Sequence, residues 1–330
     1  MSRTEQQTFL AFAYAEVARR EKENKVSTAK GYARAVHSFE RFLLQQGIED
    51  LHISQLTAGL LKQYETWLRQ NNVTANSSSA YNRSLHAIYR KMTEEQPPAP
   101  DPFADIFRGV AETAKRAVSS NDIHLIATID IQAALQEAWT KEGKKTNGKR
   151  FSNKVQKLTF VRDMFIFSFC SRGMNFIDMA FLHKSDVSNG TISYCRSKTK
   201  KCQCVKIEDE MQAIMDSHPS DSIYQFPILN PTDDANALYK AYNSAISSFN
   251  KGLAELGKLL NLQLTTYVSR HSWADIAFEQ EGIYFVSEGL GHNSIKTTQV
   301  YINSINNNRL AAGNRNLIKK VLHPENDEES

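Results

Sequence analysis

The cluster ProProAlaProAspPro at residues 97–102 constrains the fold more than any other feature of the sequence. Proline lacks an amide hydrogen and fixes its own φ angle, so a helix cannot run through this segment. The length of 330 residues favours two domains, since a domain usually holds roughly 100–200 residues. We place the boundary near residues 116–122, which gives one domain over 1–116 and another over 123–330.

The first domain has the pattern of a helical bundle. Apolar residues recur at helical spacing around residues 9–17 and in three later runs. A short further helix is predicted at 103–115. The predicted N-terminal caps of the three runs are Ser27 or Thr28, Thr57, and Ser77 or Ser78, and Gly47 should end the first of them.

The second domain has a mixed pattern. Residues 130–140 and 155–170 are predicted to be helical, and the chain returns to mainly helical patterns from about 208 onward. Residues 191–195 and 202–207 alternate like the two strands of a hairpin. The fold class is therefore mainly α (α+β), with a small antiparallel β-hairpin sheet.

The charge of the chain is unevenly distributed, and its basic regions could bind a polyanion. The formal net charge is +4, and removing the four carboxylates of the tail 324–330 raises it to +8. A solvated face is the more ordinary explanation of one basic helix, but two such faces in one domain favour DNA, because a helix fits the major groove. The candidate DNA-binding residues on these helices are Lys30, Arg34, Arg41, Arg83 and Arg90.

Two other motifs resemble ligand sites without meeting their requirements. The loop 143–150 nearly matches a phosphate-binding loop, but it ends in Arg150 where Ser or Thr should hold magnesium. We interpret it as a basic surface loop in which Lys145 and Lys149 touch DNA. Cys202 and Cys204 are separated by a single residue, which is too short a gap for a typical zinc pair. No metal and no cofactor are expected.

The composition also bears on where the protein works. No apolar run approaches the roughly 20 residues that a bilayer span requires, and the N-terminus lacks the pattern of a signal peptide. The four cysteines are expected to be reduced thiols. We therefore expect no membrane partner and a cytoplasmic, nucleoid-associated location.

The most informative residues lie near the C-terminus. The segment 265–274 contains Arg270, and the segment 288–301 contains LeuGlyHis, with His292, followed by Tyr301. Each residue alone has an ordinary structural explanation. As an ordered set, they resemble the signature of the tyrosine recombinases, the phage integrase family, and most of all the integrases of Bacteroides-type mobile elements and inversion systems. The helical first domain resembles that family's SAM-like core-binding domain, so the resemblance covers nearly the whole chain.

The resemblance implies a role for each matching residue. Tyr301 matches the nucleophile, which attacks a DNA phosphate and forms a 3′-phosphotyrosyl bond, so that rejoining needs no ATP. Arg270 and His292 match the donors that stabilise the transition state, and Asp178 matches an acidic residue that orients its neighbours. Lys198 matches the general acid that protonates the leaving 5′-oxygen, although Lys200 or Lys201 could take this place.

The sequence departs from the family pattern at two positions. Tyr267 stands where the family has a histidine three residues before the arginine. Asn175 stands where the family has its first arginine, three residues before Asp178. Residues three apart share a helix face, so Arg172 could supply the guanidinium from the next turn.

The resemblance also implies double-stranded DNA as the substrate and a homotetramer on it. The segment 309–322 has helical apolar spacing and either joins protomers or packs on its own domain. Two alternatives stay open: a degenerate recombinase that binds DNA without cutting it, and a type IB topoisomerase-like enzyme. The sequence does not specify the target site or choose between integration, excision and inversion.

Overall fold

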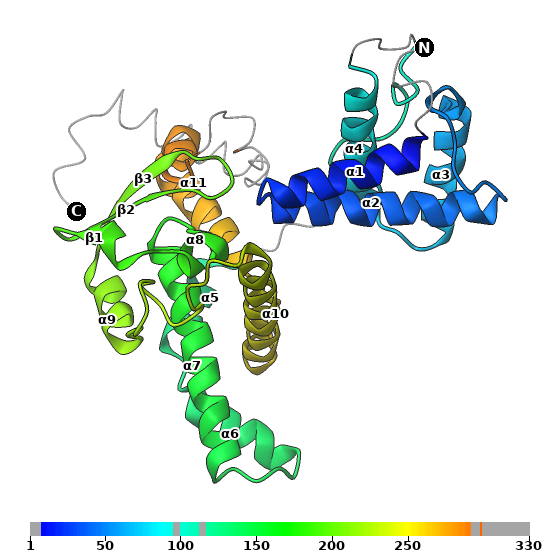
Figure 1. Ribbon diagram of the computed structural model, residues 1–330. Helices are drawn as coiled ribbons and strands as arrows, with labels where there is room; N and C mark the ends of the chain where they lie inside the picture. The colour runs from blue at the N-terminus through cyan, green and yellow to red at the C-terminus, as the bar shows by residue number, and fades with distance from the viewer. Residues whose placement is uncertain (1–7, 95–99, 112–116, 292–297, 299–330) are drawn as a thin grey trace, which may run out of the picture. The chain divides into compact units, whose positions relative to one another are not determined.

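A computed structural model of the chain describes residues 8–94, 100–111, 117–291 and 298 (Figure 1). The chain forms two compact units, one of Met1–Ala114 with Thr232–Lys240 and the other of Lys115–Pro231 with Ala241–Ser330. The predicted site residues His292 and Tyr301 and the segment 309–322 lie outside the described residues. None of the described helices has the length and apolar composition needed to cross a bilayer.

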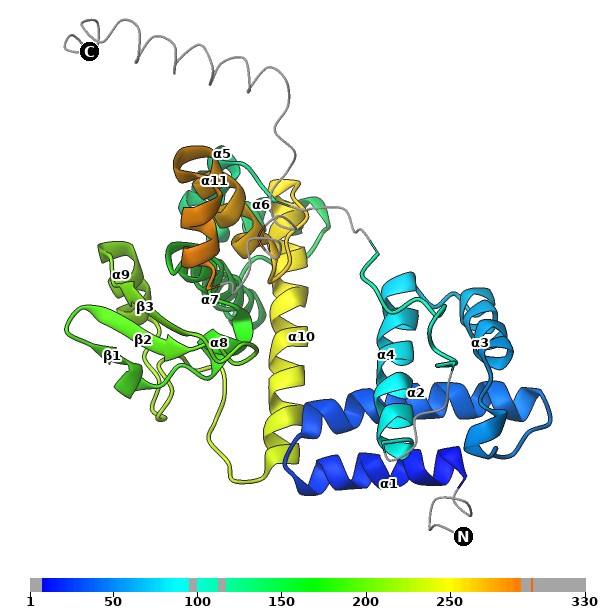
Figure 2. The same cartoon turned by 90° about the horizontal axis from the view of Figure 1, so that it is seen from above.

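The first unit is a bundle of helices around an aromatic core. In Figures 1 and 2, α1 and α2 run side by side, and α4 crosses α2. Phe39 lies at the centre of the core, with its ring 5.9 Å from that of Phe9 and 5.1 Å from that of Tyr64, both edge-on. The helices are α1 (Phe9–Lys22), α2 (Val26–Gln45), α3 (Ala58–Gln70) and α4 (Ala75–Met92), with a short turn of 3-10 helix, η2 (Ile53–Gln55), before α3.

The helices of this unit are those expected from the sequence, but two of them begin earlier than predicted. Thr57 caps α3 as predicted. In α4 the cap is Thr74, whose hydroxyl accepts the amide of Ser77, so the serine predicted to open the helix already lies inside its first turn. The α2 helix begins at Val26, ahead of both predicted cap residues, and ends at Gln45, two residues before Gly47.

The helix predicted at 103–115 is not formed over the residues that the structure describes. Within it, residues 103–111 form turns and irregular chain instead, because side chains of α4 take up their backbone groups. The Asn76 amide donates to the carbonyl of Ala111 and accepts its N–H, and Ser79 Oγ donates to the carbonyl of Gly109. Phe103 is fully buried and anchors the segment in the core.

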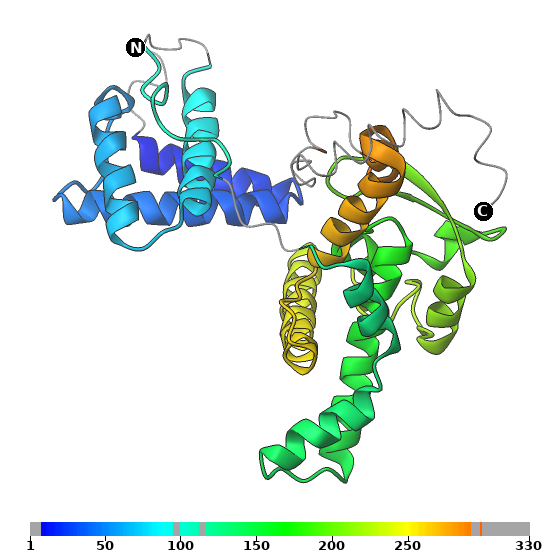
Figure 3. The same ribbon diagram turned by 180° about the vertical axis from the view of Figure 1, so that it is seen from behind.

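The second unit is built around one long helix, α7 (Lys149–Cys170), which packs against α5, α6, α9 and α11. Figure 3 shows α6 at one end of α7 and α11 beside the other. The helices predicted at 130–140 and 155–170 are thus confirmed as α6 and part of α7. The remaining helices are α5 (Ser120–Thr128), α6 (Ile131–Lys141), α8 (Phe176–Ala180), η3 (Lys184–Asp186), α9 (Asp209–Ser217), α10 (Ala235–Leu260) and α11 (Val268–Gly289).

A small antiparallel sheet completes the second unit. Its strands are β1 (Val187–Ser188), β2 (Thr191–Cys195) and β3 (Cys202–Lys206), in the order β1-β2-β3. The predicted hairpin is confirmed, and Tyr194 pairs with Gln203 in its register. The mainly helical fold with one small sheet is therefore as expected.

The expectation of four reduced cysteines is wrong for two of them. Cys195 and Cys202 face each other across the hairpin, with 3.9 Å between their Cα atoms, and form a disulfide. Cys170 and Cys204 are free thiols. The spacing along one strand relates Cys202 to Cys204, whereas the pairing register places Cys202 opposite Cys195.

Candidate active site

Arg270 lies in the first turn of α11 and is buried. Its Nη1 donates to the carbonyl of Gly173 at 2.7 Å, and its Nη2 donates to the carbonyl of Leu290 at 2.8 Å. Gly173 has φ +70°, and a Cβ atom there would lie 2.8 Å from Arg270 Cγ. Only glycine accommodates both this backbone conformation and the close approach of the arginine. The chain after α7 and the end of α11 therefore meet around this guanidinium.

Arg196 is a second buried guanidinium at the same place, and it was not among the site residues predicted from the sequence. Its side chain follows strand β2, and the residue is only 6% exposed. Its Nη1 donates to the carbonyls of Leu290, at 2.9 Å, and Gly291, at 3.3 Å. The carbonyl of Leu290 therefore accepts from both arginines. The one signal in the sequence is proximity, since Arg196 comes two residues before Lys198, the predicted general acid.

Asp178 fixes the loop that carries Arg196. The carboxylate is buried on α8, and its Oδ1 accepts the amide of Ser197 at 2.8 Å. Its other oxygen lies 3.5 Å from Asn175 Nδ2. Asp178 is therefore not a surface carboxylate but a link between α8 and the hairpin loop.

The pKa of Tyr194 is shifted by burial and by the charged side chains around it. Its pKa is raised to about 12, first because the ring is buried and second because the Asp178 carboxylate is near. Arg270, Arg196 and Arg172 act in the opposite direction. Three guanidiniums and one carboxylate thus act on the same half-buried tyrosine.

The candidate general acids lie on the loop between β2 and β3. The loop closes through two backbone hydrogen bonds, from Arg196 N to Lys201 O and from Lys200 N to Arg196 O, each 2.9 Å long. Lys198 is exposed in the turn at the tip. Lys201 Nζ lies 3.4 Å from a carboxylate oxygen of Glu288. Lys198 and Lys200 are both exposed, and of the three lysines Lys198 lies within the turn.

Tyr267 and Arg172, the candidate replacement for the arginine missing at Asn175, lie at different depths. Arg172 follows the end of α7 with φ +58° and is half-buried. Tyr267 precedes α11 and is 57% exposed, with its ring centroid 6.5 Å from that of His271. The structure therefore brings Arg270, Asp178 and Arg172 near the half-buried Tyr194, whereas Tyr267 faces solvent.

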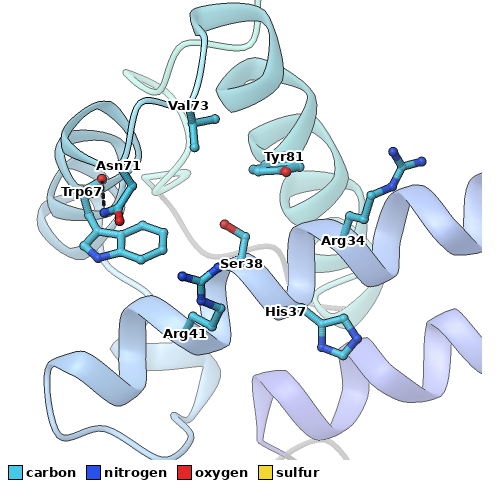
Figure 4. Close-up of a pocket in the computed structure, with 8 residues that line it drawn as sticks. All are labelled: Arg34, His37, Ser38, Arg41, Trp67, Asn71, Val73 and Tyr81. Carbon is cyan, nitrogen blue, oxygen red and sulfur yellow. Dashed lines mark hydrogen bonds between the residues drawn. The ribbon is translucent and has the colours of Figure 1, made fainter.

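Two of the candidate DNA-binding residues of the first unit, Arg34 and Arg41, line a hollow on its surface. Figure 4 shows this pocket of about 300 Å³ between α2, the end of α3 and the start of α4. The Arg41 guanidinium lies 5.8 Å from the centroid of the Trp67 ring, a distance compatible with a cation–π contact. The lining residues are Arg34, His37, Ser38, Arg41, Trp67, Asn71, Val73 and Tyr81.

The other predicted cations on these helices have different surroundings. Arg90 is exposed on α4, and Lys30 Nζ lies 3.4 Å from a Glu21 carboxylate oxygen. Arg83 Nη1 donates to Ser79 Oγ and to the carbonyls of Arg108 and Gly109. Arg83 therefore also holds the chain that follows the proline cluster.

The basic loop of the second unit joins two helices rather than a strand and a helix. It runs from the end of α6 to Gly148, the N-cap of α7, which has φ +85°. Lys145 and Lys149 are both exposed. The prediction that helix, not strand, precedes the loop is confirmed, which argues against a phosphate-binding loop.

Comparison with known proteins relates both units to integrases. Residues 8–108 match the family described as the phage integrase SAM-like domain. A Tn1549 transposon integrase in complex with a circular intermediate DNA has a TM-score of 0.63 and 13% identity over 94% of this chain and 100% of the other. The chain has the fold of the integrases. The helical first domain thus matches the domain that the sequence resembled, and the whole chain shares the integrase fold.

Two lambda integrase structures agree with this assignment. The 75–356 fragment, a dimer bound to a COC' core site, has a TM-score of 0.56 and 13% identity over 85% of this chain and 93% of the other. A lambda integrase tetramer bound to a Holliday junction has a TM-score of 0.59 and 13% identity over 90% and 78%. At such identities the likeness concerns the fold. No curated protein matches the sequence.

Proposed function

We propose that the protein is a site-specific DNA recombinase that integrates, excises or inverts DNA through a 3′-phosphotyrosyl intermediate on Tyr301. One observation carries the proposal most directly. The buried guanidinium of Arg270 lies where the chain after α7, the hairpin and the last turn of α11 meet. A fixed, buried cation of this kind can stabilise the negative charge that develops on a phosphate during transfer.

The remaining proposed roles combine the resemblance to the family with the positions of the described side chains. Arg270 contacts the non-bridging oxygens of the scissile phosphate, and His292, which directly follows Gly291, donates to the same group. Lys198, exposed at the loop tip, protonates the leaving 5′-oxygen. Asp178 positions that loop through Ser197. Arg172 and Tyr267 complete the proposed catalytic set and act from the end of α7 and the start of α11.

The proposed reaction requires no energy source. The phenol of Tyr301 gives up its proton as its oxygen bonds to phosphorus and the bond to the 5′-oxygen breaks, and the leaving oxygen takes up one proton. A 5′-hydroxyl later attacks the phosphotyrosyl ester and releases the tyrosine. Because one phosphoester replaces another at each step, ATP hydrolysis is not needed.

Binding of double-stranded DNA is assigned to the basic surfaces. In the domain over 1–116, the residues are Lys30, Arg34, Arg41, Arg83 and Arg90. In the catalytic domain over 123–330, Lys145 and Lys149 add contacts to the DNA backbone. We further propose that four protomers assemble on DNA through the segment 309–322, and that the protein acts on cytoplasmic, nucleoid-associated DNA.

The decisive experiment traps the covalent intermediate. The target is first mapped as DNA covalently bound to the protein in cells that carry the native element. A synthetic duplex of that site, nicked next to the cleavage position, then releases a short strand and prevents rejoining. Wild type should accumulate a protein–DNA adduct that resists denaturant, and Tyr301→Phe should form none while binding the same duplex.

The other outcomes overturn the proposal. Binding of the mapped site without any adduct from wild type would indicate a regulatory DNA-binding protein. Relaxation of any supercoiled plasmid without site preference would indicate a topoisomerase-like activity.

A further inference from the structure

Arg196 and Arg270 donate hydrogen bonds to the same carbonyl, and Arg196 has further N–H groups that are not used within the described residues. Arg196 Nη1 and Arg270 Nη2 both donate to the carbonyl of Leu290. Arg196 Nε is buried and has no hydrogen-bond partner among the described residues. Within the same part of the chain, Arg196 Nη2 also makes no hydrogen bond. A guanidinium has five N–H donors. Among the described residues, only Nη1 of Arg196 donates hydrogen bonds, and both of its acceptors are neutral carbonyls.

The cluster around Arg196 is predominantly positive. Arg196, Arg270 and Arg172 lie close enough to affect the phenol of Tyr194, and Asp178 is the carboxylate that acts with them. One oxygen of that carboxylate is already bonded to the amide of Ser197. The carbonyl oxygens at the end of α11 carry only partial negative charge. Buried cations are normally paired with an anion, and the printed acceptors of Arg196 are neutral carbonyls, so its guanidinium is suited to bind one.

The position that lacks an arginine in the sequence motif lies next to this cluster. Asn175, which stands there, directly precedes α8, and Asp178 of α8 holds the loop of Arg196. Arg172 is half-buried, and its side chain makes no hydrogen bond or ion pair with a described residue. Arg196 is more deeply buried and shares an acceptor with Arg270, so its guanidinium is fixed before DNA arrives.

We propose that Arg196 is a catalytic residue that contacts the scissile phosphate beside Arg270, and so supplies from the hairpin the guanidinium that the motif lacks at Asn175. The inference rests on the recombinase function proposed above. Two guanidiniums can each bridge phosphate oxygens, which fixes the orientation of the phosphate and neutralises its charge. Arg196 then unites two parts of the site, since it donates to Gly291 and lies on the loop of Lys198.

The test compares a charged with a neutral phosphate at the cleavage position. The nicked duplex is made with an ordinary phosphodiester or with a methylphosphonate, in which a methyl group replaces one non-bridging oxygen and removes the charge. On the phosphodiester, Arg196→Ala should form adduct on the order of 10²–10³ times more slowly than wild type. On the methylphosphonate, which has less charge to stabilise, the variant should recover most of the difference from wild type.

Matched variants separate catalysis from structure. Lys206→Ala removes an exposed cation from the far end of the same hairpin and should leave both rates unchanged. Arg196→Lys keeps the charge without the planar fork and should fall between wild type and Arg196→Ala. Thermal melting and binding to the intact duplex are measured for every variant, so that rates are compared only between folded proteins that bind DNA.

Three results would overturn the inference. Arg196→Ala could cleave the phosphodiester as fast as wild type. It could be slowed by the same factor on both substrates, as expected if Arg196 only caps the end of α11. Arg172→Ala could show the selective recovery instead. Each of these requires an active wild-type enzyme, so they are distinct from failure of the recombinase proposal, in which wild type forms no adduct at all.

Discussion

Two arginines of the first unit are exposed and two of the second unit are buried, so the same type of side chain serves different purposes in the two units. Arg34 and Arg41 lie on the surface of α2 beside a hollow of about 300 Å³. Arg196 and Arg270 are buried and hydrogen-bonded to main-chain carbonyls. An exposed cation remains hydrated and screened by salt, so it contributes to affinity. A buried cation acts in a lower dielectric, where its effect on a reacting phosphate is larger.

The largest effect is expected from replacing a buried arginine. Arg270→Ala removes a fixed donor of the proposed site and should slow adduct formation by about 10²–10³. Its affinity for intact duplex should change little, because one buried donor adds little to a binding face made of many exposed cations. Single-turnover cleavage of the nicked duplex and a binding titration at the same salt measure the two quantities. Equal decreases in both would contradict the division between binding and reaction.

For the exposed arginines we expect the opposite pattern, in which DNA affinity falls and the rate of adduct formation does not. Replacing both Arg34 and Arg41 with Ala should weaken DNA binding and lower the slope of log affinity against log salt by about 2, because each arginine neutralises one phosphate. At saturating protein, the rate of adduct formation should stay near that of wild type. The titration is repeated at several salt concentrations. Arg69→Ala, an exposed arginine of α3 outside the pocket lining, is the matched control.

The same comparison explains what could be predicted from the sequence. Exposed cations on amphipathic helices follow from local spacing, and so does the cap of α3 at Thr57, whereas α2 and α4 begin before their predicted caps. Arg196 could not be found this way, because its acceptor Leu290 is 94 residues away and only the tertiary fold brings the two together. The register that opposes Cys195 to Cys202 is likewise a property of the pairing and not of either strand.

The disulfide offers a smaller test of how rigidly the buried arginine is held. Replacing Cys195 and Cys202 with Ser should remove about 2 kcal/mol of stabilisation from the hairpin, because a covalent link limits the unfolded chain. The rate of adduct formation should fall several-fold, since Arg196 and Lys198 both lie on the closed loop. Wild type treated with dithiothreitol should match the variant. The affinity for intact duplex should not respond to the reductant, since it depends on the exposed cations.

A buried charge that already has partners should affect stability and not catalysis. Asp163 of α7 accepts hydrogen bonds from His218, at 2.7 Å, and from Arg162, at 2.7 Å. Burial raises the pKa of Asp163, but the two hydrogen bonds outweigh it and hold the pKa below its ordinary value of 3.8. Because the folded-state pKa is lowered, the stabilisation is present above pH 3.8 and is lost as the pH falls through the folded value.

Asp163→Asn therefore lowers stability near neutral pH, by about 1–3 kcal/mol, because it removes the charge from two hydrogen bonds. The difference from wild type should shrink in acid, where the wild-type carboxyl takes up its proton. Denaturant unfolding at a series of pH values from neutral to below 3.8 measures this difference. The rate of adduct formation at neutral pH should be that of wild type, in contrast to Arg196→Ala. A constant difference in stability across the series would show that the charge of Asp163 is not what holds α7 to His218.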